Sequence, residues 1–186
     1  MASAEVIGGI DLSGVTYRIE QSLLGNTYSV YDGGGELLLR ADPRRFDSHR
    51  ELPFRDTDGE EVFRVEANGF GDGYSVVPAD SDRPVAILER NFSPLQHRWR
   101  VRHGSDDQLL ATIEAQGPVV EFFRYYVPMM GILPHTYTIE SADGSAIGEL
   151  SRRFSVSDTY ELALDRGVEL PHTAVVLAAF ALDALD

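Results

Sequence analysis

The chain has 186 residues, which suits a single domain over residues 1–186 with a sizeable core, and 43% of them are hydrophobic, which excludes wholesale disorder. It contains no Cys, so disulfides, thiolate catalysis and Cys-based metal sites are excluded. Thirty acidic residues face sixteen basic residues, all of them Arg, for a formal net charge of −14, and we therefore expect no binding to nucleic acid.

The acidic residues are scattered along the chain and do not form a block or a tail. We interpret them, together with the absence of Lys, as an adaptation of the surface to a salty cytoplasm, a habit of halophilic archaea. The alternative is a local function, the binding of a cationic partner. The N-terminus has neither the basic region nor the long apolar run of a signal peptide, so we expect a cytoplasmic protein, with the membrane surface as the other location.

Short alternating stretches separated by turn residues predict about twelve β-strands between residues 15 and 163. Asp32–Gly35 and Asp58–Gly59 predict hairpin turns, and residues 41–51 predict an exposed loop. The predicted strands are Thr16–Glu20, Asn26–Tyr31, Glu36–Arg40, Leu52–Asp56, Glu61–Ala67, Tyr74–Val77, Val85–Arg90, Arg98–His103, Leu109–Glu114, Tyr137–Glu140, Ala146–Ser151 and Thr159–Ala163.

The C-terminal stretch differs from everything before it. Every residue from Ala174 to Leu182 is apolar, and Pro171 stands where the first turn of a helix tolerates proline. A helix without a polar face is surrounded by protein or lipid, and this one is too short to span a bilayer. We therefore predict a buried helix over about residues 171–185, with the strands wrapped around it.

An internal repeat connects the strands. The segment YSVVPADSDRPVAILERNFS, from Tyr74, matches YTIESADGSAIGELSRRFS, from Tyr137, and a weaker copy, YSVYDGGGELLLR, begins at Tyr28. Each copy is a hairpin, and hairpins that close into a barrel leave no exposed edge. The fold class we predict is mainly β, a closed antiparallel barrel of about twelve strands around a central helix.

These hairpins, the segment HRWRV at His97–Val101 and the apolar C-terminal stretch resemble the LURP-one-related family, whose fold is shared with the tubby C-terminal domain and the phospholipid scramblases. The resemblance covers nearly the whole chain and implies a twelve-stranded barrel around a buried helix. Among the relatives, tubby domains bind phosphoinositides and scramblases are calcium-linked lipid proteins. The resemblance thus implies a non-enzymatic binding or scaffold protein for lipid headgroups or a protein partner.

Arg98, Arg100 and Arg102 alternate with Trp99 and Val101, so in a strand the three guanidinium groups share one face. Aligned guanidinium groups can bind a phosphate or an anionic headgroup. The alternative is an outward face on which each Arg pairs with a neighbouring carboxylate.

The segment PVVEFFRYYVPMMGILP, from Pro118 to Pro134, is the most apolar part outside the C-terminus. It either contacts a membrane, ligand or protein, or is a buried connection that closes one end of the barrel. The candidate contact residues are Phe122, Phe123, Tyr125, Tyr126, Met129 and Met130.

We identify no catalytic, metal or cofactor site. Asp56–Glu61 lacks the ligand spacing of a calcium loop and is expected to be a hairpin turn. The His residues show no metal-binding spacing, and no nucleophile motif occurs. The remaining enzymatic hypothesis is a hydrolase whose carboxylates meet across strands, and its signature would be a deep acidic pocket with raised carboxyl pKa values.

Overall fold

A ring of twelve antiparallel strands closes on itself in the computed structural model, as the sequence predicted. The structure describes residues 6–7, 9–22, 27–42, 51–69, 73–93, 96–115, 136–153, 159–168, 174 and 176. Its strands are β1 (Val6–Ile7), β2 (Ile10–Asp11), β3 (Thr16–Gln21), β4 (Tyr28–Asp32), β5 (Leu37–Ala41), β6 (Glu51–Arg55), β7 (Glu61–Ala67), β8 (Gly73–Pro78), β9 (Ala86–Ser93), β10 (Gln96–His103), β11 (Leu109–Ala115), β12 (Thr136–Ser141), β13 (Ala146–Arg153) and β14 (Thr159–Leu164).

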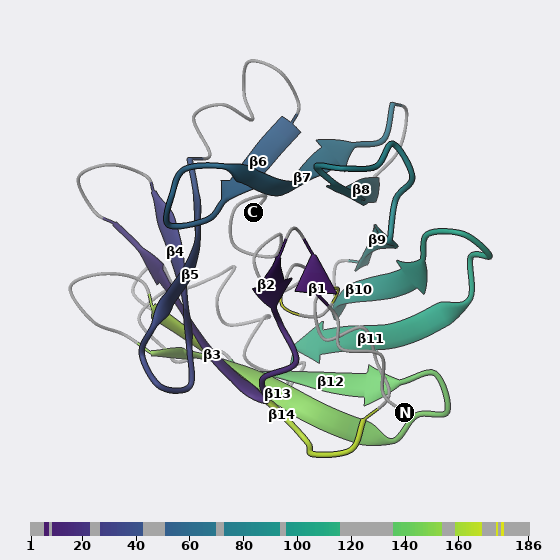
Figure 1. The fold of residues 1–186 in the computed structure, drawn as a ribbon. Coiled ribbons are helices and arrows are strands. Elements are labelled where there is room, and N and C mark those ends of the chain that lie inside the picture. Colours follow the sequence, from purple (N-terminus) through teal and green to yellow (C-terminus); the bar gives the residue numbers. More distant parts are fainter. Residues whose placement is uncertain are drawn as a thin grey trace.

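Each strand from β3 to β14 pairs with its sequence neighbours, and β14 pairs with β3 to complete the ring. Because consecutive strands run in opposite directions, the connections after β4, β6, β8, β10 and β12 all lie at one end of the barrel, here named the tight-turn end. The short pair β1–β2 forms a sheet of its own and lies across the middle of the ring in Figure 1. Sequence analysis did not predict this pair.

Buried apolar residues alternate with exposed residues along the strands, and the buried side chains form the core of the barrel. On β3, for example, Tyr17 and Ile19 are 3% and 1% exposed, whereas Arg18 between them is exposed. Phe54 of β6 stacks on Phe63 of β7 inside the barrel, with 4.6 Å between the ring centroids and both rings fully buried. Side chains of this kind fill the ring from every strand.

The repeat predicted from sequence is visible in the strand pairing. Tyr28 lies opposite Ala41, Tyr74 opposite Leu88, and Tyr137 opposite Leu150. The three hairpins β4–β5, β8–β9 and β12–β13 begin at every fourth strand around the ring. The barrel therefore has an approximate threefold repeat of four-stranded units.

The predicted turns at Asp32–Gly35 and Asp58–Gly59 are confirmed. Asp32 and Asp56 each accept a backbone hydrogen bond from a glycine with positive φ, Gly35 at 85° and Gly59 at 87°. A positive φ is a conformation that glycine adopts without strain. Of the predicted loop at residues 41–51, Ala41 ends β5 and Glu51 begins β6, while residues 43–50 lie outside the described residues.

Two residues of the predicted C-terminal helix are described. Ala174 and Val176 have helical backbone, are 1% and 0% exposed, and belong to the core cluster of the barrel. The remainder of residues 171–185 lies outside the described residues, so the extent of the helix stays a prediction. Within the part of the chain that the structure describes, no helix is both long and apolar enough to cross a membrane.

Candidate functional site

The arginine stripe of β10, formed by Arg98, Arg100 and Arg102, lies on the outer surface of the barrel. Trp99 and Val101 between them point inward and are 2% and 0% exposed. The predicted division of the two faces is therefore correct. The register places β9 on one side of the stripe and β11 on the other.

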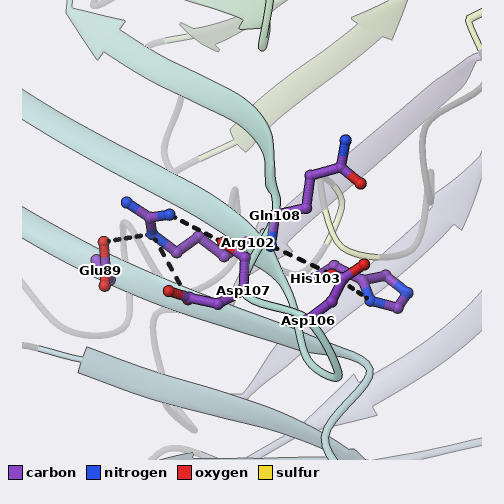
Figure 2. Close-up of polar contacts among 6 residues, drawn as sticks. All are labelled: Glu89, Arg102, His103, Asp106, Asp107 and Gln108. Carbon is purple, nitrogen blue, oxygen red and sulfur yellow. Dashed lines mark hydrogen bonds and ion pairs between the residues drawn. The ribbon is translucent and has the colours of Figure 1, made fainter.

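Two of these three guanidinium groups are already bound to carboxylates. Arg98 donates two hydrogen bonds to Glu114 Oε2 of β11, at 2.6 Å from Nη2 and 3.1 Å from Nε. Arg102 Nε donates to Glu89 Oε2 of β9 at 2.9 Å, and this bond raises the pKa of Arg102. Figure 2 shows Arg102 between Glu89 and Asp107, whose carbonyl oxygen accepts a further bond from Nη1 at 2.9 Å.

Arg100 differs from its neighbours. Its Cα lies opposite Glu89 and Thr112, but the Glu89 carboxylate is directed to Arg102, and no ion pair joins Arg100 to another described residue. A ligand with one phosphate would therefore have one unoccupied guanidinium group on this face and would compete with Glu89 and Glu114 for the other two.

The same arrangement recurs around the barrel wall. Arg–Glu pairs lie along β3, along β7 and between β13 and β14. Exposed pairs of this kind contribute at most about 1 kcal/mol each and weaken further in salt. Among the described residues of the wall, most arginines are therefore paired with a glutamate of the same or a neighbouring strand. These pairs are Arg18–Glu20, Arg64–Glu66 and Arg153–Glu161.

The turn after β10 contains a Ser, a His and an Asp in contact. His103 Nδ1 lies 2.9 Å from Ser105 Oγ. It also lies 3.1 Å from Asp106 Oδ1, and Figure 2 shows this second contact. A catalytic triad needs the serine and the acid on opposite ring nitrogens, whereas here both approach Nδ1. The His103 side chain is also 42% exposed, so the arrangement is a turn contact and not a nucleophile site.

Sequence analysis did not single out the two arginines that point into the barrel. Arg90 of β9 lies over the ring of Trp99, with 5.9 Å from Cζ to the ring centroid, and Arg152 of β13 lies over Tyr160, at 5.7 Å. The repeat aligns these two positions, and their spacing of two residues from Leu88 and Leu150 was the signal that they face inward.

A pocket of about 570 Å³ opens at the tight-turn end, and no motif predicted it. One wall is the N-terminal strap, defined here as β1, β2 and residues 12–14. The others come from β3 and β5 and from the turns after β4 and β6. Its lining residues are Gly9, Ile10, Asp11, Ser13, Gly14, Tyr17, Asp32, Glu36, Leu37, Leu38, Asp56 and Thr57.

Three of the four carboxylates that line this pocket accept hydrogen bonds from backbone N–H groups of their own turns. Asp32 Oδ1 accepts the N–H groups of Gly34 and Glu36, at 2.9 and 2.7 Å. In the next turn, Asp56 Oδ1 accepts two N–H groups in the same way, both at 2.9 Å. Each of these aspartates thus uses one oxygen for the turn, which explains why turns of this type favour Asp.

Asp11 is the third of these carboxylates, and its Oδ1 accepts a hydrogen bond from the N–H of Ser13 at 2.9 Å. Hydrogen bonds from Ser13, first from the side chain and then from the backbone, lower the pKa of Asp11. Among the described residues, no ion pair involves any of the four carboxylates, and no group of three His, Asp or Glu side chains is close enough to hold one metal ion.

The second predicted candidate, Pro118–Pro134, lies outside the described residues. Its contact residues, Phe122, Phe123, Tyr125, Tyr126, Met129 and Met130, therefore remain a prediction.

Comparisons with known proteins agree with the fold. The X-ray structure of a protein from Arabidopsis thaliana is similar over 99% of this chain and 100% of that chain, with a TM-score of 0.58 and 11% sequence identity. At 11% identity, this structural similarity shows a shared fold and nothing about function. No curated protein sequence matches the chain. The LURP-one-related profile matches residues 15–183, which include every strand of the barrel. The chain therefore belongs to the LURP-one-related family.

Proposed function

We propose that the protein is a non-enzymatic binding module that recognises a protein partner. The observation that supports this is the distribution of charge on the barrel. Side chains fill the interior, so a partner meets the outer wall or an end of the barrel. On the wall most arginines are paired with Glu, whereas the tight-turn end carries carboxylates that have no arginine partner among the described residues.

Anionic lipid headgroups are the other ligand class that the sequence suggested. Arg98 and Arg102 would have to exchange Glu114 and Glu89 for a phosphate, and at molar salt the Debye length of about 3 Å leaves little long-range attraction to a membrane. The geometry of the stripe therefore favours a protein partner over lipid.

A hydrolase with carboxylates across strands is the enzymatic alternative. A general acid of that kind needs a raised pKa, but the pKa of Asp11 in the pocket is lowered. The contact of His103 with Ser105 and Asp106 has the wrong nitrogen geometry for a triad.

Liposome co-sedimentation in about 1 M KCl tests the proposal, with phosphatidylglycerol and phosphatidylcholine vesicles compared side by side. We expect the protein to stay in the supernatant with both. Pelleting selective for phosphatidylglycerol, and lost in the Arg98→Ser/Arg100→Ser/Arg102→Ser variant, would overturn the proposal in favour of lipid recognition. Pelleting on both lipids, unchanged in that variant, would also overturn it and would direct attention to residues 118–134.

A further inference from the structure

The junction between β5 and β6, here named the β5–β6 seam, is the least extensively paired junction of the ring. Over the residues that the structure describes, it joins two register pairs, Arg40 with Arg55 and Ala41 with Phe54. Each of the other eleven junctions joins four or more pairs. β6 also contains Pro53, which has no N–H group to donate to a neighbouring strand. Closure of the ring at the seam therefore depends on few contacts between strands.

One of the two register pairs places like charges opposite each other. Arg40 and Arg55 both point outward, because their neighbours Ala41 and Phe54 are buried. Side chains at directly opposite positions have Cβ atoms about 4.5–5.5 Å apart, and like charges there are destabilising. Within the described strands, no other register pair joins two arginines. The charges of this pair therefore oppose closure of the seam.

A carboxylate compensates one member of the pair and not the other. Arg55 Nη1 donates to the carbonyl oxygen of Gly59 at 2.9 Å, and Nη2 lies 3.7 Å from Glu61 Oε2. Arg40 is exposed and forms no ion pair with any described residue. Its register neighbour on β4 is Ser29, so no carboxylate lies opposite Arg40 on either side.

Other arginines without an ion pair in the described part of the chain do not share this arrangement. Arg83 and Arg166 lie on exposed turns and have no register partner. Arg100 has Glu89 directly opposite on β9. The seam is distinguished by a second guanidinium group opposite the first, at the junction where the strands hold each other least.

A phosphate group matches the row that Ser29, Arg40 and Arg55 form across β4, β5 and β6. Its oxygens can accept two parallel hydrogen bonds from a guanidinium group, and its negative charge attracts both arginines at once. The Ser29 hydroxyl is a further donor beside Arg40. Asp42, the next carboxylate along this face of β5, forms no ion pair with Arg40 in the described structure. The seam thus offers donors from three strands to one oxyanion.

We propose that the β5–β6 seam binds a phosphate group between Arg40 and Arg55, and that this binding stabilises the closed seam. The phosphate replaces a repulsion between the two strands by an attraction of each strand to the same anion. The site is separate from the surface that recognises a protein partner in the proposed function.

NMR titration of the protein with potassium phosphate, at an ionic strength kept at about 1 M with KCl, tests the binding. We expect saturable shifts of the amide signals of Ser29, Arg40 and Arg55, and an affinity about tenfold or more weaker in Arg40→Gln. The control is Arg83→Gln, which removes the same charge from an exposed turn and should bind as the wild type does. Shifts centred on Arg100, equal weakening in the two variants, or no saturable shift would each overturn the inference.

Thermal melting in the same two salts tests the effect on the seam. Phosphate stabilises proteins in general by exclusion from their surface, so the comparison between variants carries the result. On addition of saturating phosphate, the melting temperature of the wild type and of Arg83→Gln should rise by about 2 °C or more beyond that of Arg40→Gln. Arg40→Glu, which places opposite charges across the seam, should melt above the wild type without phosphate. Equal rises in the wild type and Arg40→Gln would overturn the inference.

Co-sedimentation with phosphatidic acid and phosphatidylcholine vesicles identifies the source of the phosphate group. Phosphate binding without pelleting on either lipid assigns the seam to a soluble phosphate. Pelleting that is selective for phosphatidic acid, lost in Arg40→Gln and retained in Arg98→Ser/Arg100→Ser/Arg102→Ser assigns it to a lipid headgroup. Either result supports a phosphate site at the seam. The proposed function is tested through the arginine stripe of β10, so the two failures are distinguishable.

Discussion

Replacing Val176 by Asp tests whether the C-terminal stretch forms part of the barrel core. Val176 is 0% exposed within the core cluster, so the substitution loses about 1.5–3 kcal/mol of apolar burial. A buried carboxyl without a hydrogen-bond partner costs about 1–3 kcal/mol more even when it is protonated. The sum, about 2.5–6 kcal/mol, is a large part of the free energy of unfolding of a typical domain, which is about 5–15 kcal/mol.

The pH dependence gives this variant a signature of its own. Burial raises the folded-state pKa of the new carboxyl above its unfolded value of about 3.9. The folded state then binds the proton more tightly, so the destabilisation relative to wild type is smallest near pH 4 and grows as pH rises, by up to about 1.4 kcal/mol per unit.

Urea unfolding at pH 4 and pH 7 measures both effects, with the fluorescence of Trp99 as the reporter. This is the one tryptophan of the chain and is 2% exposed, so it becomes solvated on unfolding. Ala79→Asp, on an exposed turn after β8, is the matched control and should unfold as the wild type does. A Val176→Asp protein with wild-type stability at both pH values would refute the placement of this stretch in the core.

Two further substitutions test local features. At Gly104 an added Cβ would overlap the backbone carbonyl of Pro84, which no side-chain rotation can relieve, so Gly104→Ala should lower stability by about 3 kcal/mol or more. At Gly59 an added Cβ would meet no other atom, and only the positive φ would be strained, so Gly59→Ala should lower stability by about 1–2 kcal/mol. Equal losses of stability in the two variants, measured by thermal melts, would contradict this ranking. Hydrogen bonds from the Ser141 hydroxyl, then from the Ser145 N–H, lower the pKa of Asp143 to about 2. The stability that this lowered pKa contributes is present above about pH 4 and is lost as pH falls towards 2. Ser141→Ala should therefore raise the titration midpoint of the Asp143 carboxyl, measured by NMR. An unchanged midpoint would rule out the Ser141 hydroxyl as the cause.

The local sequence pattern was sufficient to predict the barrel strands because each strand buries one of its faces. Alternation as in Tyr17–Arg18–Ile19, together with turn signals such as Asp58–Gly59, located all twelve strands, with ends that differ by a few residues. The pair β1–β2 escaped detection because two-residue strands are too short to show a period.

The candidate site was less accessible to sequence reasoning. The outward face of the arginine stripe follows from alternation alone, but the partners of Arg98 and Arg102 depend on the register with β11 and β9. The pocket depends on the position of the strap beside the turns at Asp32 and Asp56, and the β1–β2 pair of the strap was not predicted. Neither the register between strands nor the position of the strap can be read from one strand at a time.

Hydrogen–deuterium exchange with and without hexa-arginine, a soluble cationic peptide that stands in for a basic protein partner, tests most directly whether the carboxylates of the tight-turn end take part in recognition. The measurement is made in about 1 M KCl, which screens attraction to the overall charge. The account predicts slower exchange in peptides that cover residues 9–17, 32–38 and 56–60, with the outer strands β9 to β11 unchanged. Protection along β10, or none at the tight-turn end, would contradict it.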